Sequence, residues 1–203
     1  MGVALQPFGD RAWRASLPEG VSCRALLAAL RALPRVVDAV VTERHAIVTF
    51  DPDAAAPEGV SEAIERALSE PTTPANPREH VVRVRYDGAD LEEVAERAGF
   101  SAADVISLHA GGSYVVTVIG FLPGFAYLRG LDARLVVPRR ATPRARIAEL
   151  SVGVAGPYTG VYPFASPGGW NIIGVAVGFS PFDPRSGAAL ALGDRVRFVR
   201  EGS

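Results

Sequence analysis

Lysine is absent from this sequence, because all 21 basic residues are arginine. Without lysine the chain cannot form a Schiff base, cannot complete the G-x-x-x-x-G-K-[ST] phosphate loop, and cannot hold a covalently attached biotin or lipoate. We therefore expect no biotin and no pyridoxal phosphate on this chain. The arginines are scattered among 22 acidic residues for a net charge of -1. The sequence has no basic stripe of the kind that binds nucleic acid, so we expect no nucleic acid partner.

Cysteine, long apolar runs and closely spaced histidines are also scarce or absent. Cysteine occurs once, as Cys23, so no internal disulfide can form and the chain is compatible with a reducing compartment. No apolar run approaches the roughly 20 residues that span a bilayer, and the N-terminus lacks a basic stretch followed by an apolar segment and a cleavage site. These absences predict a cytoplasmic protein without a membrane partner. His45, His80 and His109 are widely spaced, so we expect no metal site.

A proline-rich segment divides the chain. Three prolines lie within Pro71–Pro77, and proline there disfavours both helix and sheet and favours an extended linker. A length of 203 residues allows two compact units. We therefore predict a domain over residues 1–70, a linker over 71–77 and a second domain over 78–203.

The first of these domains alternates strands and helices. The periodicity predicts the order ββαββα and a small α+β domain, with a sheet covered on one face by two helices. The expected elements are short strands within Val3–Leu17, a helix capped by Ser22 with Leu26, Leu30 and Leu33 on one face and ended by Pro34, strands Val36–Thr42 and Ala46–Phe50, and a helix containing Val60, Ile64 and Leu68.

The second domain is mostly strand. Val82, Val84 and Tyr86 alternate with Arg83 and Arg85, as in a strand with one buried and one solvated face. Further strand candidates are Tyr114–Ile119, Ser151–Ala155, Trp170–Val177 and Arg195–Val199. Helical stripes occur only between Leu91 and His109. The pattern predicts a β-barrel with one or two helices covering its ends.

Three loop segments combine glycine, proline, aromatic and arginine residues. In residues 120–128, GFLPGFAYL, the proline and glycine favour a rigid loop that positions aromatic side chains. Residues 138–144, PRRATPR, present three guanidinium groups suited to a carboxylate or phosphate, although a solvated basic loop is the alternative. Residues 166–174, SPGGWNIIG, offer backbone N–H groups to an anion or form a plain turn before a strand.

Together with SVGVAG (151–156), TGVYP (159–163) and GDRVRF (193–198), these segments occur in an order that resembles a known family. The family contains subunit PxpB of bacterial 5-oxoprolinase, the kinase inhibitor KipI and subunit 1 of allophanate hydrolase. A weaker match extends to Phe8-Gly9-Asp10 and Thr49-Phe50-Asp51-Pro52. The resemblance implies an α+β N-terminal domain followed by a mainly-β cyclophilin-like barrel.

The resemblance also implies a function. It indicates a subunit of an ATP-dependent amidohydrolase that opens 5-oxoproline to glutamate, with ATP as cofactor, held by this chain or by a partner. The implied partners are a homologous PxpC/KipA-like subunit and a PxpA-like subunit, besides the small-molecule substrate. Two alternatives stay open: a KipI-like inhibitor of a sensor histidine kinase, and a carboxyltransferase-like component similar to allophanate hydrolase or urea amidolyase.

The candidate site residues lie within the matching segments. His109 is the candidate catalytic acid–base, since imidazole titrates near neutrality, and a structural histidine is its alternative. The candidates for binding substrate or an anion are Arg139, Arg140, Arg144, Tyr162, Ser166, Gly168 and Gly169, and those for the pocket wall are Phe121, Pro123, Phe125, Tyr127 and Trp170.

The sequence departs from the family pattern at three places. Val175-Ala176 stands where Arg-Thr is expected, Glu149-Leu150 replaces small residues, and Tyr158 stands where glutamine is expected. If the missing Arg and Thr line the active site, we expect a changed substrate or a changed activity.

Overall fold

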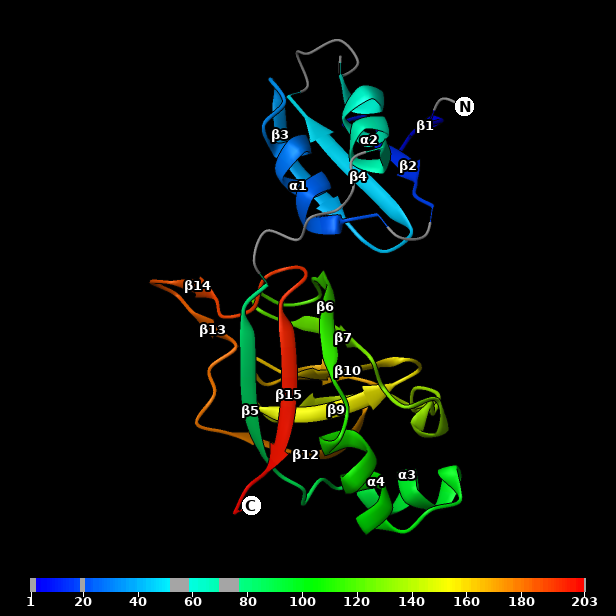
Figure 1. Cartoon of the computed structure of the whole chain (residues 1–203), viewed down its shortest axis with the longest axis vertical. Coiled ribbons are helices and arrows are strands. Elements are labelled where there is room, and N and C mark those ends of the chain that lie inside the picture. The colour runs from blue at the N-terminus through cyan, green and yellow to red at the C-terminus, as the bar shows by residue number, and fades with distance from the viewer. Residues whose placement is uncertain (1–2, 19–20, 52–58, 70–76, 203) are drawn as a thin grey trace. The chain divides into compact units, whose positions relative to one another are not determined.

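The chain folds into two units, Met1–Pro77 and Arg78–Ser203. The computed structural model describes residues 3–18, 21–51, 59–69 and 77–202 (Figure 1). The expected linker, Pro71–Pro77, lies outside the described residues except for Pro77.

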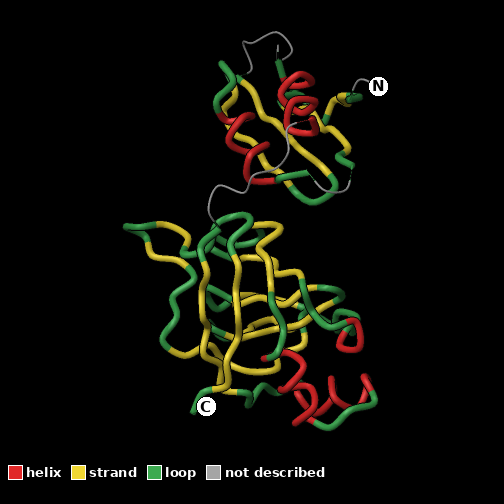
Figure 2. The backbone as a smooth tube through the Cα atoms, viewed as in Figure 1, coloured by secondary structure: helices red, strands yellow, loops and turns green. Residues whose placement is uncertain are grey.

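The first unit is a four-stranded sheet with two helices on one face (Figures 1 and 2). The sheet order is β1-β2-β4-β3, with antiparallel neighbours. The elements are β1 (Leu5–Pro7), β2 (Ala12–Ser16), α1 (Cys23–Arg31), β3 (Val36–Val41), β4 (His45–Phe50) and α2 (Val60–Ser69). The Ser22 side chain caps α1 by accepting the N–H of Ala25. Leu33, expected within this helix, follows its end at Arg31.

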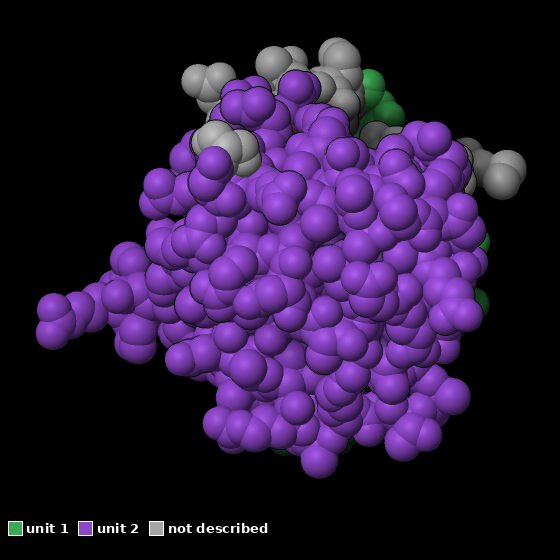
Figure 3. Space-filling model, turned by 90° about the horizontal axis from the view of Figure 1, so that it is seen from below, with its two compact units in different colours: residues 1–77 green, residues 78–203 purple. Residues whose placement is uncertain are grey.

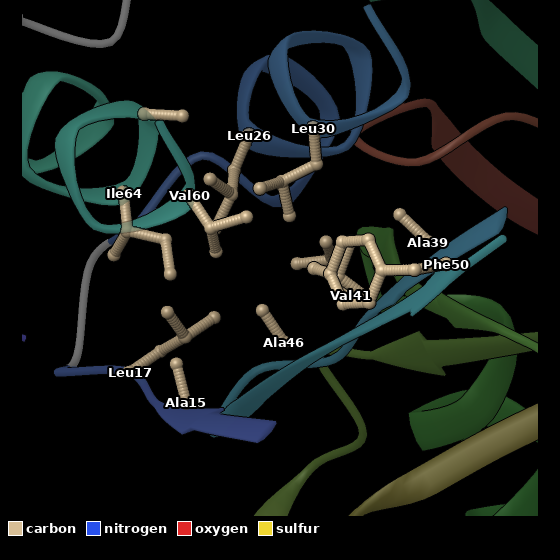
Figure 4. Packing of buried hydrophobic residues seen from close by; sticks show 12 residues of the cluster. Ala15, Leu17, Leu26, Leu30, Ala39, Val41, Ala46, Phe50, Val60 and Ile64 are labelled. Atoms are coloured by element: carbon tan, nitrogen blue, oxygen red, sulfur yellow. The ribbon is translucent and has the colours of Figure 1, made fainter. Parts of the chain in front are cut away.

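The core of this unit lies between the helices and the sheet. Figure 4 shows Leu26 and Leu30 of α1, with Val60 and Ile64 of α2, on the side that faces Ala46 of β4. None of these five side chains is more than 1% exposed. Burying one large aliphatic side chain contributes about 1.5–3 kcal/mol. This layer of helices on a sheet is the α+β part of the fold class expected from the sequence.

The second unit contains a closed barrel with the strand order β10-β7-β6-β15-β5-β12-β9. These strands are β5 (Glu79–Arg85), β6 (Tyr114–Ile119), β7 (Ala126–Arg129), β9 (Ser151–Ala155), β10 (Tyr158–Val161), β12 (Asn171–Val177) and β15 (Arg195–Arg200). Only β5 and β15 run parallel, with Arg195 beside Glu79 and Arg200 beside Val84. Val82 and Val84 point inward and are no more than 1% exposed. The mainly-β barrel expected from the sequence is confirmed.

Two helices lie at one end of the barrel (Figures 1 and 2). α3 (Leu91–Ala98) packs against β12, and α4 (Ala102–Ala110) packs against β15. Ser101 and Asp104 form a capping box at the start of α4. None of the helices in the described ranges is long and apolar enough to cross a membrane.

Short elements complete the second unit. The pair β8 (Arg144–Ile147) and β11 (Ser166–Gly168) forms a separate two-stranded sheet, and η1 (Ala133–Leu135) is a 3₁₀ turn. The hairpin of β13 (Phe182–Asp183) and β14 (Gly187–Ala188) projects from the surface, as Figure 3 shows at its left edge. The loops beside β8 and β11 position the pocket described next.

Candidate functional site

A pocket of about 310 Å³, including the space at its open mouth, lies in the second unit. Two of its residues come from the loop between β6 and β7, one from β7, one from the loop before β8 and one from just after β10. One more comes from the end of β11, and two come from the loop between β11 and β12. Its lining consists of Phe121, Phe125, Tyr127, Arg139, Tyr162, Gly168, Gly169 and Trp170. All eight are residues that the sequence indicated as site candidates, and the fold brings them together.

Phe125 is the centre of the aromatic wall. Its ring centroid lies 5.1 Å from those of Tyr127 and Tyr162, 5.3 Å from that of Trp170 and 5.5 Å from that of Phe121, each pair edge to face. Such pairs contribute about 0.5–1.5 kcal/mol each beyond burial. Phe125 is buried, whereas Phe121 is 58% exposed with φ 74°. The wall is therefore rigid at its base and open to solvent at Phe121.

The pocket contains one formal charge, that of Arg139. Burial raises the pKa of Tyr162 to about 12 and also raises that of Tyr127, while the nearby positive charge of Arg139 acts in the opposite direction on both. Both phenols are therefore neutral near pH 7. Among the residues that the structure describes, Arg139 has no ion-pair partner. One available guanidinium between neutral aromatic rings suits a compact anion with a flat apolar body.

Position 168 favours glycine because the backbone there passes close to the Tyr162 side chain. A Cβ at Gly168 would lie 2.6 Å from the Tyr162 hydroxyl and 2.7 Å from Cδ1 of Ile147. A side chain at this position would displace the tyrosine ring from the pocket. The backbone of Gly168 and Gly169 therefore forms part of the pocket surface.

His109 lies in the barrel core, outside the pocket lining. It is fully buried, with Nδ1 2.7 Å from the Tyr86 hydroxyl and Nε2 2.9 Å from Oγ1 of Thr159. Thr159 donates its own proton to the carbonyl of Gly153, so it accepts from Nε2–H, and Nδ1 accepts from Tyr86. Burial lowers the pKa of His109 to about 3. A neutral imidazole with both nitrogens occupied is unsuited to proton exchange with a ligand, and the arrangement supports the structural alternative.

Arg140 and Arg144 lie outside the pocket lining, and both are paired with Asp90. Arg140 Nη1 donates to Asp90 Oδ1 at 2.8 Å and to Glu93 at 2.9 Å, and Arg144 donates to both Asp90 oxygens at 2.6 and 2.7 Å. Burial alone would raise the pKa of Asp90, but hydrogen bonds from Arg144 and from the N–H of Ile172 hold it below its usual value. These two guanidinium groups neutralise a buried carboxylate, and Arg139 is the arginine of the three that lines the pocket.

Asp90 was not among the residues that the sequence indicated. The available signal was an acidic residue immediately before the helical stripe that begins at Leu91. A residue at that position normally caps the helix, yet the Asp90 side chain makes no capping bond. Its arginine partners lie some fifty positions away in the chain.

Two other candidates lie outside the lining. Ser166 is buried on β11, and its hydroxyl has no hydrogen-bond partner among the described residues. Pro123 is exposed in the loop between β6 and β7. In the described parts of the chain, no three histidine, cysteine, aspartate or glutamate residues lie together as potential metal ligands.

The departures from the family pattern fall in different places. Val175 and Ala176 lie on β12 beside Arg85 and Val84 of β5, and neither lines the pocket. The Tyr158 ring lies 5.7 Å from that of Tyr127, which does line it. The absence of Arg-Thr therefore removes nothing from this pocket, whereas Tyr158 backs its wall.

The chain matches one family model and is similar to curated proteins. The family model for the carboxyltransferase domain, subdomain C and D, matches residues 3–191. The chain is 48% identical over 123 residues to the 5-oxoprolinase B subunit of Escherichia coli O157:H7, a match that covers 58% of this chain and 56% of that protein. It is 46% identical over 115 residues to the 5-oxoprolinase B subunit of Bacillus subtilis strain 168, covering 56% and 48%. The match thus spans about half the length of these curated relatives.

Solved structures show the same architecture. The crystal structure of TTHA0988 matches with a TM-score of 0.80 at 37% identity, over 95% of this chain and 41% of that chain. The urea carboxylase of Kluyveromyces lactis matches with a TM-score of 0.73 at 16% identity, over 98% and 22%. The second likeness concerns the fold alone.

Proposed function

The chain belongs to the family of carboxyltransferase domains, subdomain C and D, and from this premise we propose that it is a subunit of an ATP-dependent 5-oxoprolinase. The enzyme would open the lactam ring of 5-oxoproline to give glutamate. Relatives named as the B subunit of 5-oxoprolinase, at 46–48% identity, support the proposal. Because the match spans about half of those relatives, the activity of the whole enzyme is part of what is proposed.

The pocket supports this substrate by its charge and its aromatic lining. 5-Oxoproline is a five-membered ring with one carboxylate, and the pocket combines one available guanidinium, that of Arg139, with aromatic walls. Arg139 would bind the carboxylate through paired N–H donors. Tyr127 and Trp170 would contact the ring faces, and the neutral Tyr162 hydroxyl would donate a hydrogen bond. This combination of a single cation with an aromatic cavity is the observation on which the proposal depends.

ATP and the partner subunits belong to the same proposal. A lactam carbonyl is a poor electrophile, and phosphorylating its oxygen prepares the carbon for attack by water. A triphosphate normally requires several cationic groups or a metal ion, whereas this pocket supplies one arginine. We therefore assign the nucleotide to a homologous PxpC/KipA-like subunit, with a PxpA-like third component.

Reconstitution tests the proposal. The chain is purified with the two partner subunits, and ATP-dependent glutamate release from 5-oxoproline is compared with reactions that omit one component. Arg139→Gln should lower kcat/KM by about tenfold to a hundredfold, the value of a charge-assisted hydrogen-bond pair. Arg146→Gln, an exposed arginine on the neighbouring β8, is the matched control and should keep wild-type activity.

Two outcomes would contradict the proposal. One is a folded, assembled complex that releases no glutamate. The other is wild-type turnover by Arg139→Gln. If the chain alone suppresses autophosphorylation of a sensor histidine kinase and supports no turnover, the inhibitor alternative replaces the enzyme.

A further inference from the structure

We infer that Asp90 is a positioning residue that prepares Arg139 to bind a carboxylate, acting through Arg140 and Arg144. Asp90 does not line the pocket. The inference rests on the proposed function, because it concerns the same pocket, but it depends on contacts that lie within this chain. In this proposal the buried Asp90 carboxylate determines which of the three arginines faces the pocket and where its side chain lies.

The Asp90 carboxylate has a complete set of partners. Oδ1 accepts from Arg140 Nη1 at 2.8 Å and from Arg144 Nη2 at 2.6 Å, and Oδ2 accepts from Arg144 Nη1 and from the N–H of Ile172, both at 2.7 Å. A carboxylate has about four acceptor sites. Asp90 is 1% exposed, so these charge-assisted bonds form away from water, where they hold their partners firmly.

The backbone on both sides of Arg139 is bonded to the segment around the start of β12, which Asp90 also contacts through the N–H of Ile172. The carbonyl of Pro138 accepts from the side chain of Asn171 at 2.9 Å, and the N–H of Arg140 donates to the carbonyl of Gly169 at 2.8 Å. Gly169 itself lines the pocket. Because neighbouring Cα atoms are about 3.8 Å apart, fixing both neighbours of Arg139 restricts where its side chain starts. A site of this kind gains affinity when its residues are held before the ligand arrives.

The negative charge of Asp90 has a second effect, on which arginine is available to an anion. Three arginines within one short loop segment, residues 138–144, repel one another and would compete for one anion. Asp90 pairs with two of them, and Glu93 adds a second acceptor for Arg140. Arg139 remains as the guanidinium that faces the pocket. Asp90 therefore decides which arginine is available as well as where it lies.

The test compares two ligands that differ by one group. 5-Oxoproline and 2-pyrrolidinone share the lactam ring, but 2-pyrrolidinone lacks the carboxylate. Affinities are measured by calorimetry on the full chain assembled with its partner subunits. Asp90→Asn keeps the size of the side chain and removes its charge. We expect it to weaken 5-oxoproline binding at least about tenfold and to leave 2-pyrrolidinone within about twofold. A merely structural role would lower the binding-competent fraction equally for both ligands.

A matched control and a double-mutant cycle complete the design. Asp87→Asn removes an exposed carboxylate from the same loop, one that pairs with Arg85, and should change neither affinity. In an Arg139→Gln background, Asp90→Asn should have no further effect, since the two residues act in series. A further loss of about tenfold in that background would show that Asp90 acts independently of Arg139 and would overturn the inference.

A second variant, Arg140→Gln, and amide hydrogen exchange test the same positioning role independently. If Asp90→Asn does not fold, Arg140→Gln removes one arm of the arrangement, and an unchanged preference for 5-oxoproline would overturn the inference. Amide hydrogen exchange of residues 138–144 should be at least about tenfold faster in Asp90→Asn than in wild type. Unchanged exchange refutes the positioning role. Faster exchange in a protein that binds no 5-oxoproline supports the positioning role and refutes the proposed substrate.

Discussion

Acidification from pH 7.5 to pH 5 is expected to destabilise the barrel through His109. Burial lowers the pKa of this imidazole from 6.5 to about 3, so a proton binds more tightly to the unfolded chain than to the folded one. The contribution of neutral His109 to stability is complete above pH 6.5 and declines as the pH falls toward 3. Between pH 6.5 and about 3, each fall in pH therefore favours unfolding through His109.

The magnitude follows from proton linkage. At pH 5 the unfolded histidine gains about RT ln(1 + 10^1.5), roughly 2 kcal/mol, and the buried one gains almost nothing. The result depends on the unfolded pKa alone as long as the folded value stays below about 4. For a barrel of this size, about 2 kcal/mol lowers Tm by roughly 6–10 °C. Buried carboxylates whose pKa is already low, such as Asp90, contribute only below this pH window.

The assay follows unfolding of the barrel in urea. Trp13 lies in the first unit and Trp170 is buried in the second, so a Trp13→Phe background makes Trp170 fluorescence report on the barrel. In His109→Gln the drop between pH 7.5 and pH 5 should shrink by about 2 kcal/mol, although the variant starts less stable. His45→Gln, in the other unit, is the control and should keep the wild-type drop. An equal drop in wild type and His109→Gln would refute the reasoning.

Three further outcomes are expected. Gly88→Ala places a Cβ 2.3 Å from the carbonyl carbon of Ile173, whereas at Gly120 nothing lies within 4 Å; urea unfolding should show a loss of about 3 kcal/mol for the first and under about 1 kcal/mol for Gly120→Ala. Burial raises the pKa of the Cys23 thiol, so its reaction with a disulfide reagent at pH 7.5 should be at least about tenfold slower than in the unfolded chain, and equal rates would contradict this. Asp194 is buried and accepts backbone and histidine hydrogen bonds; Asp194→Asn should cost about 2–4 kcal/mol, and an unchanged Tm would show that these bonds contribute little.

The candidate site was readable in part from local sequence. Seven of the eight pocket residues lie in the three loop segments that combine glycine, proline, aromatic and arginine residues, and Tyr162 lies in the segment 159–163. These residue types shape rigid loops and supply flat walls. The same segments do not distinguish Arg139 from Arg140 and Arg144. The difference between them is the carboxylate of Asp90, about fifty residues earlier in the chain. Local composition therefore indicated the pocket and not the charge that it presents.

His109 illustrates the same limit. A histidine before a strand, in a region matched to a known family, suggested acid–base chemistry. Its role depends on what surrounds it: Tyr86 and Thr159 occupy both ring nitrogens, and burial keeps the ring neutral. None of these neighbours is adjacent in the sequence, and the solvation of a side chain has no local signature.

The sequence alone determined the kinds of element and the fold class, because the period of apolar residues along a helix or strand follows from backbone geometry. It also determined the exclusions that follow from the absence of lysine and the single cysteine. Tertiary structure alone decided the parallel pairing of β5 with β15, the burial of His109 and the pairing that leaves Arg139 available. Each of these features depends on contacts between residues that are distant in the sequence. The energies of these contacts depend on the exclusion of water, which occurs only in the folded protein.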